Sequence, residues 1–127
     1  MNRIVLDASA ILAVLGREPG ADRVLPHVMD TAASTVNLAE VHGRLVGRGI
    51  PHDEAWEASV SLVRDVVDFD SEQAALAGRL VPDTKPFGLS LGDRACLALS
   101  MLLKAPVYTT ERAWKNLKLG IQIHVIR

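Results

Sequence analysis

The architecture of this chain can be inferred first from the stretch Ile4-Val5-Leu6-Asp7-Ala8-Ser9-Ala10-Ile11-Leu12-Ala13. Its opening run of apolar, largely β-branched residues predicts a buried strand over residues 3–6. The apolar residues that follow predict a helix over residues 9–15, which Gly16 ends. A strand that passes almost directly into a helix is the repeating unit of a parallel α/β sheet. Asp7 stands at the junction between the two elements.

The same alternation continues along the 127 residues, so we expect an α/β fold with a mostly parallel sheet and helices on both faces. There are no internal repeats and no linker, and we expect one domain spanning residues 1–127. The predicted strands are 31–35, 66–69, 107–109 and 121–126; the predicted helices are 21–29, 35–46, 51–64, 71–81 and 91–103; residues 82–89 are expected to form a loop.

Four acidic residues lie where predicted strands end or predicted helices begin. Asp7 closes the first strand, Glu40 and Asp93 each lie one turn into a helix, and Glu111 follows the strand 107–109. In a parallel sheet these positions share one edge, where ligands bind. Carboxylates crowded at one edge repel each other unless a cation neutralises them. Mg²⁺ prefers oxygen ligands and binds phosphate, so the pattern indicates metal-dependent phosphate chemistry.

Each acid also has a local explanation that involves no metal. Asp7 could cap the helix that follows it. Asn37–Glu40 and Ser90–Asp93 both have the spacing of a capping box. Glu111 could complement the dipole of a helix. The recurrence of acids at four element boundaries favours a shared site over four independent caps.

Charge is unevenly distributed, although the formal net charge is only -1. Residues 104–127 carry five basic side chains and one acid, and residues 53–72 carry seven acids and one base. Both regions could be solvated helix faces. The basic region adjoins Glu111, however, and a basic patch beside a metal site suits a polyanionic substrate.

The remaining composition restricts the cellular context and the class of enzyme. Cys96 is the only cysteine, so no intramolecular disulfide can form, and the short apolar run after Asp7 predicts neither a signal peptide nor a membrane span. We expect a cytoplasmic protein. The sequence has no phosphate-binding glycine loop and no nucleophile elbow. Apolar residues within 53–66 exceed what a small sheet needs to cover, and we expect them to form a homodimer interface.

Four segments resemble the motifs of PIN-domain ribonucleases, and specifically VapC-type toxins of bacterial toxin–antitoxin pairs. They are residues 4–13, 37–41 (NLAEV), 89–99 (LSLGDRACLAL) and 107–114 (VYTTERAW). The order and spacing of these motifs and the chain length suit the family over the entire chain. The sequence departs from the family at Glu111, where Asp is more usual.

The resemblance implies a three-layer fold with a five-stranded, mostly parallel sheet of order 3-2-1-4-5. It implies Mg²⁺- or Mn²⁺-dependent endonucleolytic cleavage of RNA, inhibition by a cognate VapB-type antitoxin and a homodimer. Asp7 and Asp93 would bind the metal directly, and Glu40 and Glu111 would bind a second metal or act through water. The candidate substrate contacts are Ser9, Thr110 and Arg112, with Arg112 on a phosphate.

Two other functions fit parts of the pattern. A phosphotransferase with an aspartyl nucleophile uses the same type of sheet, but it needs a second acid near Asp7, and Ala8, Ser9 and Ala10 do not supply one. The alternative function is a non-catalytic RNA- or partner-binding domain whose site is impaired at Glu111.

Overall fold

A five-stranded, all-parallel sheet runs through the centre of the computed structural model, which describes residues 3–127. The strand order is β3-β2-β1-β4-β5, so the first strand lies in the middle of the sheet. The predicted fold class and the predicted order 3-2-1-4-5 are both confirmed. The strands are β1 (Ile4–Leu6), β2 (Thr31–Ser34), β3 (Asp65–Val67), β4 (Val107–Thr109) and β5 (Ile123–Val125).

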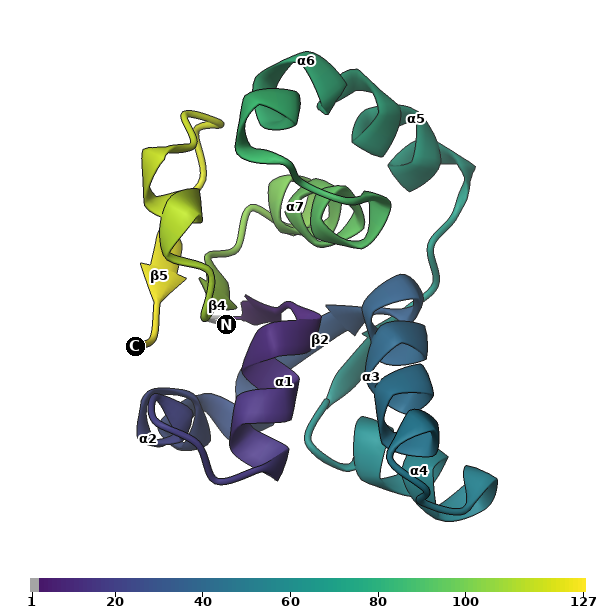
Figure 1. Ribbon diagram of the computed structural model, residues 1–127. Helices are drawn as coiled ribbons and strands as arrows, with labels where there is room; N and C mark the ends of the chain where they lie inside the picture. Colours follow the sequence, from purple (N-terminus) through teal and green to yellow (C-terminus); the bar gives the residue numbers. More distant parts are fainter. Residues whose placement is uncertain (1–2) are drawn as a thin grey trace.

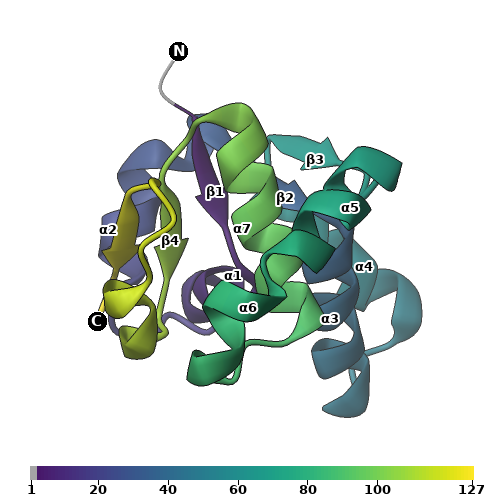
Figure 2. The same cartoon turned by 90° about the horizontal axis from the view of Figure 1, so that it is seen from above.

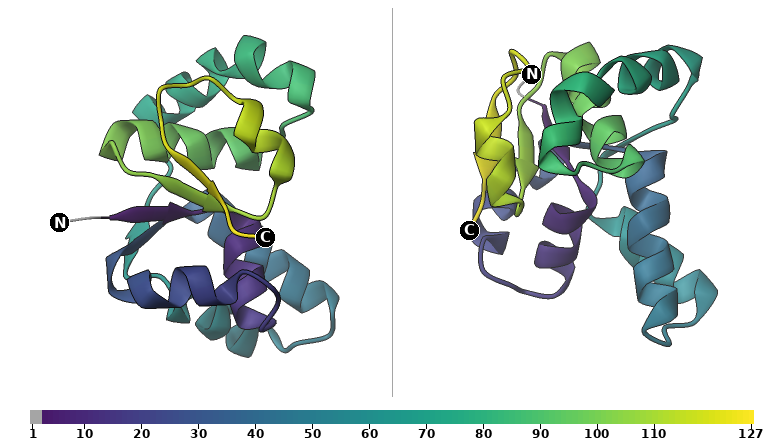
Figure 3. Two further views of the ribbon diagram at one scale, coloured as in Figure 1. Left: turned by 90° about the vertical axis from the view of Figure 1, so that its left-hand side faces the viewer. Right: turned by 45° about the horizontal axis from the view of Figure 1, so that its top comes forward.

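Helices cover both faces of the sheet and give the molecule three layers (Figure 1). On one face lie α1 (Ala8–Leu15), α2 (Ala21–Val24), the 3₁₀ helix η1 (Leu25–Asp30), α3 (Thr35–Gly47) and α4 (His52–Ser61). On the other lie α5 (Ser71–Arg79), α6 (Val81–Thr84), the 3₁₀ turn η2 (Lys85–Phe87) and α7 (Leu91–Leu103). A last 3₁₀ helix, η3 (Arg112–Asn116), connects β4 to β5. The side view shows the same layering, with the sheet between the two sets of helices (Figure 3).

The alternation of side chains along β1 divides the core into two halves. Ile4 and Leu6 pack with the residues of α1 and α3, whereas Val5 packs on the other side with α7 and Trp114. A central strand buried on both faces explains why the sequence reads as a continuous apolar run. Trp114 is buried in this second half, as expected of a packing anchor.

One predicted element, the loop 82–89, differs from the structure around prolines. The expected loop 82–89 contains α6 and η2, in which Pro82 and Pro86 each occupy one of the first two helical positions. Proline is favoured there because the first amides of a helix have no intrahelical acceptor. The helices expected over 51–64 and 71–81 are also shorter, ending at Ser61 and Arg79.

Residues 53–66 expose less apolar surface than the sequence suggested. Ala55, Leu62 and Val63 are buried in the core that α3 and α4 share with the sheet, whereas Trp56 and Val66 are exposed, at 40% and 41%. The α3–α4 packing therefore covers part of the face that the sequence suggested for a dimer. Within residues 3–127, no helix has the length and apolar character to cross a membrane.

The parallel register places the ends of β1 and β4 side by side. Leu6 pairs with Tyr108, and both strands run in the same direction towards the start of α1 (Figure 2). Asp7 and Thr109 therefore leave the sheet together, at the edge where α1 begins. The candidate site is built around this pair.

Candidate active site

A cavity of about 290 Å³ at the carboxyl edge of the sheet collects the four acids that the sequence singled out. Asp7 reaches it from the end of β1, Glu40 from α3, Asp93 from α7 and Glu111 from the end of β4. Ser9 and Thr110 also line it. The chain therefore brings together side chains that are up to 104 positions apart in sequence.

The carboxylate of Asp7 is the most buried group of the site, with only 3% of the residue exposed. Its Oδ1 accepts hydrogen bonds from the Ala10 amide (2.8 Å) and from the Ser9 hydroxyl (2.7 Å). Its Oδ2 accepts a hydrogen bond from the Thr109 hydroxyl at 2.6 Å. Asp7 thus caps α1, as its position suggests, and it also ties β1 to β4.

Burial raises the pKa of Asp7 from 3.8 to about 6, because the charged form loses its hydration. Hydrogen bonds from Thr109, Ala10 and Ser9 oppose this rise, and the negative charge of Asp93 adds to it. A carboxylate destabilised in this way gains more from a bound cation than an exposed one does.

Hydroxyl groups fix the end of β4 against the start of α1. The Ser9 Oγ accepts a hydrogen bond from the Thr110 amide, and the Thr109 Oγ1 accepts one from the Glu111 amide, both at 3.0 Å. Glu111 occupies the N-cap position of η3, but its side chain makes no capping hydrogen bond. Glu111 therefore does not cap η3 by a side-chain hydrogen bond, although its position at the start of η3 is the one that the dipole explanation requires.

Glu40 is held by a contact between α3 and α7. The Asn37 amide nitrogen donates to Glu40 Oε1 and to the Gly92 carbonyl, each at 3.0 Å. Asn37–Glu40 is not a capping box, because α3 begins at Thr35 and the hydroxyl of Ser34 caps it. A Cβ atom added at Gly92 would lie 2.4–2.6 Å from the Glu40 carboxylate, so only glycine permits this close approach.

Asp93 forms the capping box that the sequence suggested while it lines the cavity. Its Oδ2 accepts from the Ser90 amide at 2.9 Å, and the Ser90 Oγ accepts from the Asp93 amide at 3.2 Å. The two interpretations of this residue are compatible. Cys96, one turn further along α7, is buried, and burial raises the pKa of its thiol; the charges of Asp7, Asp93 and Glu40 raise that pKa further.

Three arginines line the same cavity, and the sequence analysis missed all of them: Arg44, Arg48 and Arg127. Arg44 and Arg48 follow Glu40 at intervals of four, the spacing of one helix face, which could have identified them. Arg112, the predicted phosphate contact, does not line the cavity. Its Nε donates instead to the carbonyl oxygen of Arg127 at 3.3 Å.

The oxygen donors that line the cavity suit a hard divalent cation, since they are carboxylates and hydroxyl groups. The buried Oδ1 of Asn37, beside Glu40, has no hydrogen-bond partner. In the part of the chain that the structure describes, no three His, Cys, Asp or Glu side chains are arranged to hold a metal ion. Asp7, Glu40 and Asp93 each accept a hydrogen bond from a local partner, and a carboxylate that does so keeps lone pairs for a cation.

The PIN domain family matches residues 4–119 of the chain. The protein belongs to the PIN domain family. This confirms the family that the four motifs suggested, and the cavity lies among those motifs. No curated protein matches the chain.

Solved structures of similar fold come from several bacteria. The PIN domain is similar to a chain of the DNA-bound VapBC complex from Salmonella typhimurium, with 17% identity, a TM-score of 0.74 and coverage of 98% of both chains. VapBC2 from Rickettsia felis, bound to a promoter DNA fragment, gives 16% identity, a TM-score of 0.72 and coverage of 95% and 96%. Mycobacterium tuberculosis VapC20, described as a sarcin–ricin loop cleaving toxin, gives 16% identity, a TM-score of 0.71 and coverage of 91% and 96%.

The raised pKa of Asp7 predicts how stability depends on pH. Between pH 3.8 and about 6 the folded protein binds more protons than the unfolded chain, so the free energy of unfolding falls as pH rises through this window. Above about pH 6 the buried charge of Asp7 lowers the free energy of unfolding by up to about 3 kcal/mol. We expect Asp7→Asn to increase the free energy of unfolding at pH 8 by about 1–2 kcal/mol, since Asn keeps one acceptor oxygen. The gain should vanish at pH 4.

Urea unfolding in EDTA at these two pH values measures the effect. Asp83→Asn is the control, because Asp83 is exposed in the first turn of α6 and lies outside the cavity. Parallel pH profiles for the wild type and Asp7→Asn would contradict the prediction.

Gly92→Ala tests the contact between α3 and α7. The new methyl group would displace the flexible end of Glu40 and break its bond to Asn37, so we expect loss of divalent-metal binding with little change in stability. Gly78→Ala is the matched control: its Cβ meets open space in α5, and alanine there should stabilise by about 0.5–1 kcal/mol. Thermal melts with and without Mn²⁺ compare the two. Equal metal-induced shifts in melting temperature would contradict the prediction.

Proposed function

We propose that this PIN domain is a metal-dependent endoribonuclease that hydrolyses RNA phosphodiester bonds as the toxin of a toxin–antitoxin pair. The observation that supports this most strongly is the cavity itself. It places five carboxylates, those of the four predicted acids and of Glu18, and three arginines around about 290 Å³ at one sheet edge. Carboxylates suit a cation and arginines suit a phosphate, so the combination favours a metal-assisted reaction on a phosphodiester.

Asp7 and Asp93 are the residues proposed to hold Mg²⁺ or Mn²⁺ directly, with Glu40 and Glu111 as ligands of a second ion or of coordinated water. A bound divalent ion supplies positive charge against the phosphate and makes a water molecule more acidic. The hydrogen bonds from Ser9 and Thr109 hold the Asp7 carboxylate in one orientation before any ligand binds. Pre-set orientation lowers the cost of assembling the reacting groups.

Arg44, Arg48 and Arg127 are proposed to bind the RNA backbone at the cavity, in place of the role first assigned to Arg112. Guanidinium groups match the geometry of phosphate oxygens. Arg127 also bonds Glu18 at 2.8 Å, and this partly exposed pair can open towards a stronger anion at little cost. Ser9 and Thr110 are proposed as substrate contacts at the other side of the cavity.

The assignment as a toxin rests on the motif resemblance and on the fold shared with the VapBC structures. We propose that the protein is a single cytoplasmic domain that binds a VapB-type antitoxin protein and forms a homodimer. The dimer rests mainly on the resemblance, since Ala55, Leu62 and Val63 are buried and Trp56 and Val66 are the only apolar side chains of residues 53–66 that remain exposed.

The alternative is a PIN domain that binds RNA or a protein partner without cleavage. It is motivated by Glu111, whose side chain is one methylene longer than the usual Asp, and by the absence of a preformed metal cluster among residues 3–127. An RNA cleavage assay separates the two functions, because a binding module retains RNA without cutting it.

Asp93→Asn should lower RNA cleavage by at least about 100-fold while the protein stays folded, because metal ligation needs the charge. The Asn oxygen still accepts the hydrogen bond from the Ser90 amide, so the free energy of unfolding should fall by only about 0.3–1 kcal/mol. End-labelled RNA incubated with Mg²⁺, Mn²⁺ or EDTA gives the rates. Asp83→Asn, the same change at a helix start outside the cavity, should cleave like the wild type. Wild-type cleavage by Asp93→Asn, or full activity in EDTA, would exclude this mechanism.

Glu111 distinguishes the nuclease from the impaired binding domain. Since its side chain caps nothing and lines the cavity, Glu111→Gln should reduce single-turnover cleavage by removing charge, and Glu111→Asp should keep or raise it. The measurement compares the three proteins on one RNA at fixed metal concentration. Identical rates would remove Glu111 from the site and leave Asp7, Glu40 and Asp93.

A further inference from the structure

A second cavity, of about 530 Å³, opens at the opposite edge of the sheet, where the strands begin. It lies at the starts of β1 and β4 and beside β5, and η1 also contributes to its wall. The polar and aromatic residues that line it are Arg3, His27, Lys104, Tyr108, Gln122 and His124. No residue of the acidic site takes part, so this cavity is separate from the candidate active site.

The lining of this cavity is cationic. Arg3 and Lys104 contribute full positive charges, and among residues 3–127 no Asp or Glu lines the cavity. Asp65, which lies outside the lining, offsets part of the charge of Arg3 by accepting a hydrogen bond from it at 2.7 Å. That pair is 39% and 45% exposed, so it neutralises Arg3 weakly. Lys104 makes no ion pair within the described residues, and it ends α7 in a left-handed conformation with φ 53°.

An aromatic stack forms one wall of the cationic cavity, close to its positive charges. The rings of Tyr108 and His124 stack at 4.6 Å, and the ring of His27 lies 5.8 Å from that of Tyr108. Burial lowers the pKa of His124, and the charges of Arg23 and His27 lower it further. The positive charges that contribute to this shift would attract an anion, and Arg3 and Lys104 in the same lining add to that attraction.

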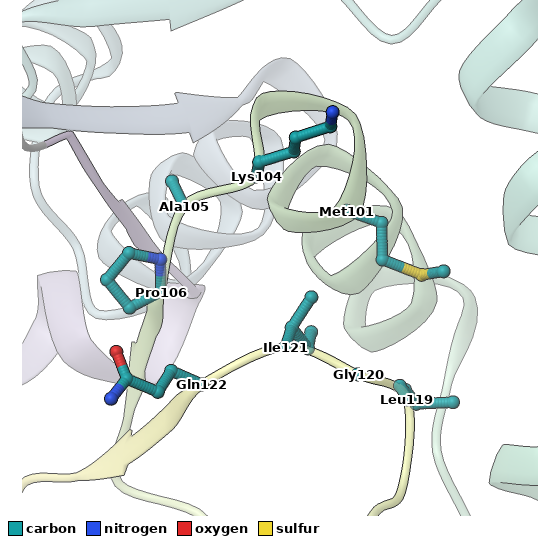
Figure 4. A pocket seen from close by; sticks show the side chains of 8 residues that line it. All are labelled: Met101, Lys104, Ala105, Pro106, Leu119, Gly120, Ile121 and Gln122. Carbon is teal, nitrogen blue, oxygen red and sulfur yellow. The ribbon is translucent and has the colours of Figure 1, made fainter.

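An apolar hollow of about 550 Å³ adjoins the cationic cavity and shares Lys104, Ala105, Pro106 and Gln122 with it. Figure 4 shows Lys104 at the end of α7, Gln122 on the approach to β5 and Ile121 directed towards the helix. Met101, Leu119 and Ile121 give this hollow its apolar lining. A ligand with an anionic head and a flat organic body matches the two hollows together.

We propose that the cationic cavity binds the phosphate group of a nucleotide, with Arg3 and Lys104 neutralising its charge and His27 and Gln122 donating hydrogen bonds. The base or sugar extends towards the apolar hollow beyond Lys104. The same chemistry serves a free mononucleotide and a nucleotide within an RNA strand. The proposal is independent of RNA cleavage, because the cavity lies at the edge opposite the four carboxylates.

The test is an NMR titration of the wild-type protein with adenosine monophosphate, in EDTA so that no divalent ion can bind the nucleotide at the acidic edge. We expect saturable shifts of the His27 and His124 ring signals and a rise in the pKa of His124. Lys104→Gln should weaken binding about fivefold, which is the effect of one nearby charge in water. Lys118→Gln is the control, because it removes a charge from the same basic region but outside both hollows.

The absence of saturable shifts at His27 and His124 would overturn the proposal. Equal weakening of binding by Lys104→Gln and Lys118→Gln would also overturn it, because it would indicate a diffuse effect of charge and not a contact with Lys104. A short oligoribonucleotide in the same assay identifies the source of the phosphate. Tighter, Lys104-dependent binding than that of the mononucleotide assigns the cavity to RNA, and equal or weaker Lys104-dependent binding assigns it to free nucleotides.

Discussion

The carboxylate of Asp7 is buried at the junction of β1, α1 and β4, and the rest of the site depends on how it is held there. Three hydrogen bonds, from Ala10, Ser9 and Thr109, keep a charge in a place that raises its pKa to about 6. A neutral side chain would be cheaper to bury at this position. The same hydroxyls position the Thr110 and Glu111 amides, so the charge also determines where the chain goes after β4.

A second constraint, the close approach of α3 and α7, completes the acidic edge. Asn37 joins the two helices by donating to both Glu40 and the Gly92 carbonyl, and Gly92 leaves the space that the Glu40 carboxylate occupies. The carboxylates repel each other, so the fold must hold them by bonds to other groups. Helix-capping hydrogen bonds hold the carboxylates of Asp7 and Asp93, and a hydrogen bond from the Asn37 amide holds that of Glu40. Capping and metal binding are therefore compatible uses of one carboxylate.

The sequence predicted what depends on local order and could not predict what depends on packing. Strand β1, helix α7 and the acids at their ends follow from apolar runs and capping patterns, which act over a few residues. The positions of Arg44 and Arg48 depend on the rotation of α3 about its axis, although their spacing from Glu40 carried a signal. Arg127 reaches the cavity only because β5 pairs with β4 and brings the end of the chain back to Glu18. The burial of Ala55, Leu62 and Val63 likewise depends on how α4 packs against α3, which composition does not reveal.

Strand β4 connects two chemically opposite edges of the sheet. Thr109, at its end, bonds the buried carboxylate, while Tyr108, one residue earlier, points to the other face and stacks with His124 beside the cationic cavity. Successive side chains of a strand alternate between the two faces of the sheet, so the neighbours Tyr108 and Thr109 take different partners. The net charge of -1 conceals this separation: five carboxylates and three arginines line the cavity where the strands end, whereas Arg3 and Lys104, with no acid among residues 3–127, line the cavity where they begin. At the strand starts a phosphate would meet Arg3 and Lys104, whereas at the strand ends it would meet a cavity in which carboxylates outnumber arginines. A divalent ion in the acidic cavity would offset the excess of carboxylates, which is the physical reason for the metal-dependent cleavage that we propose.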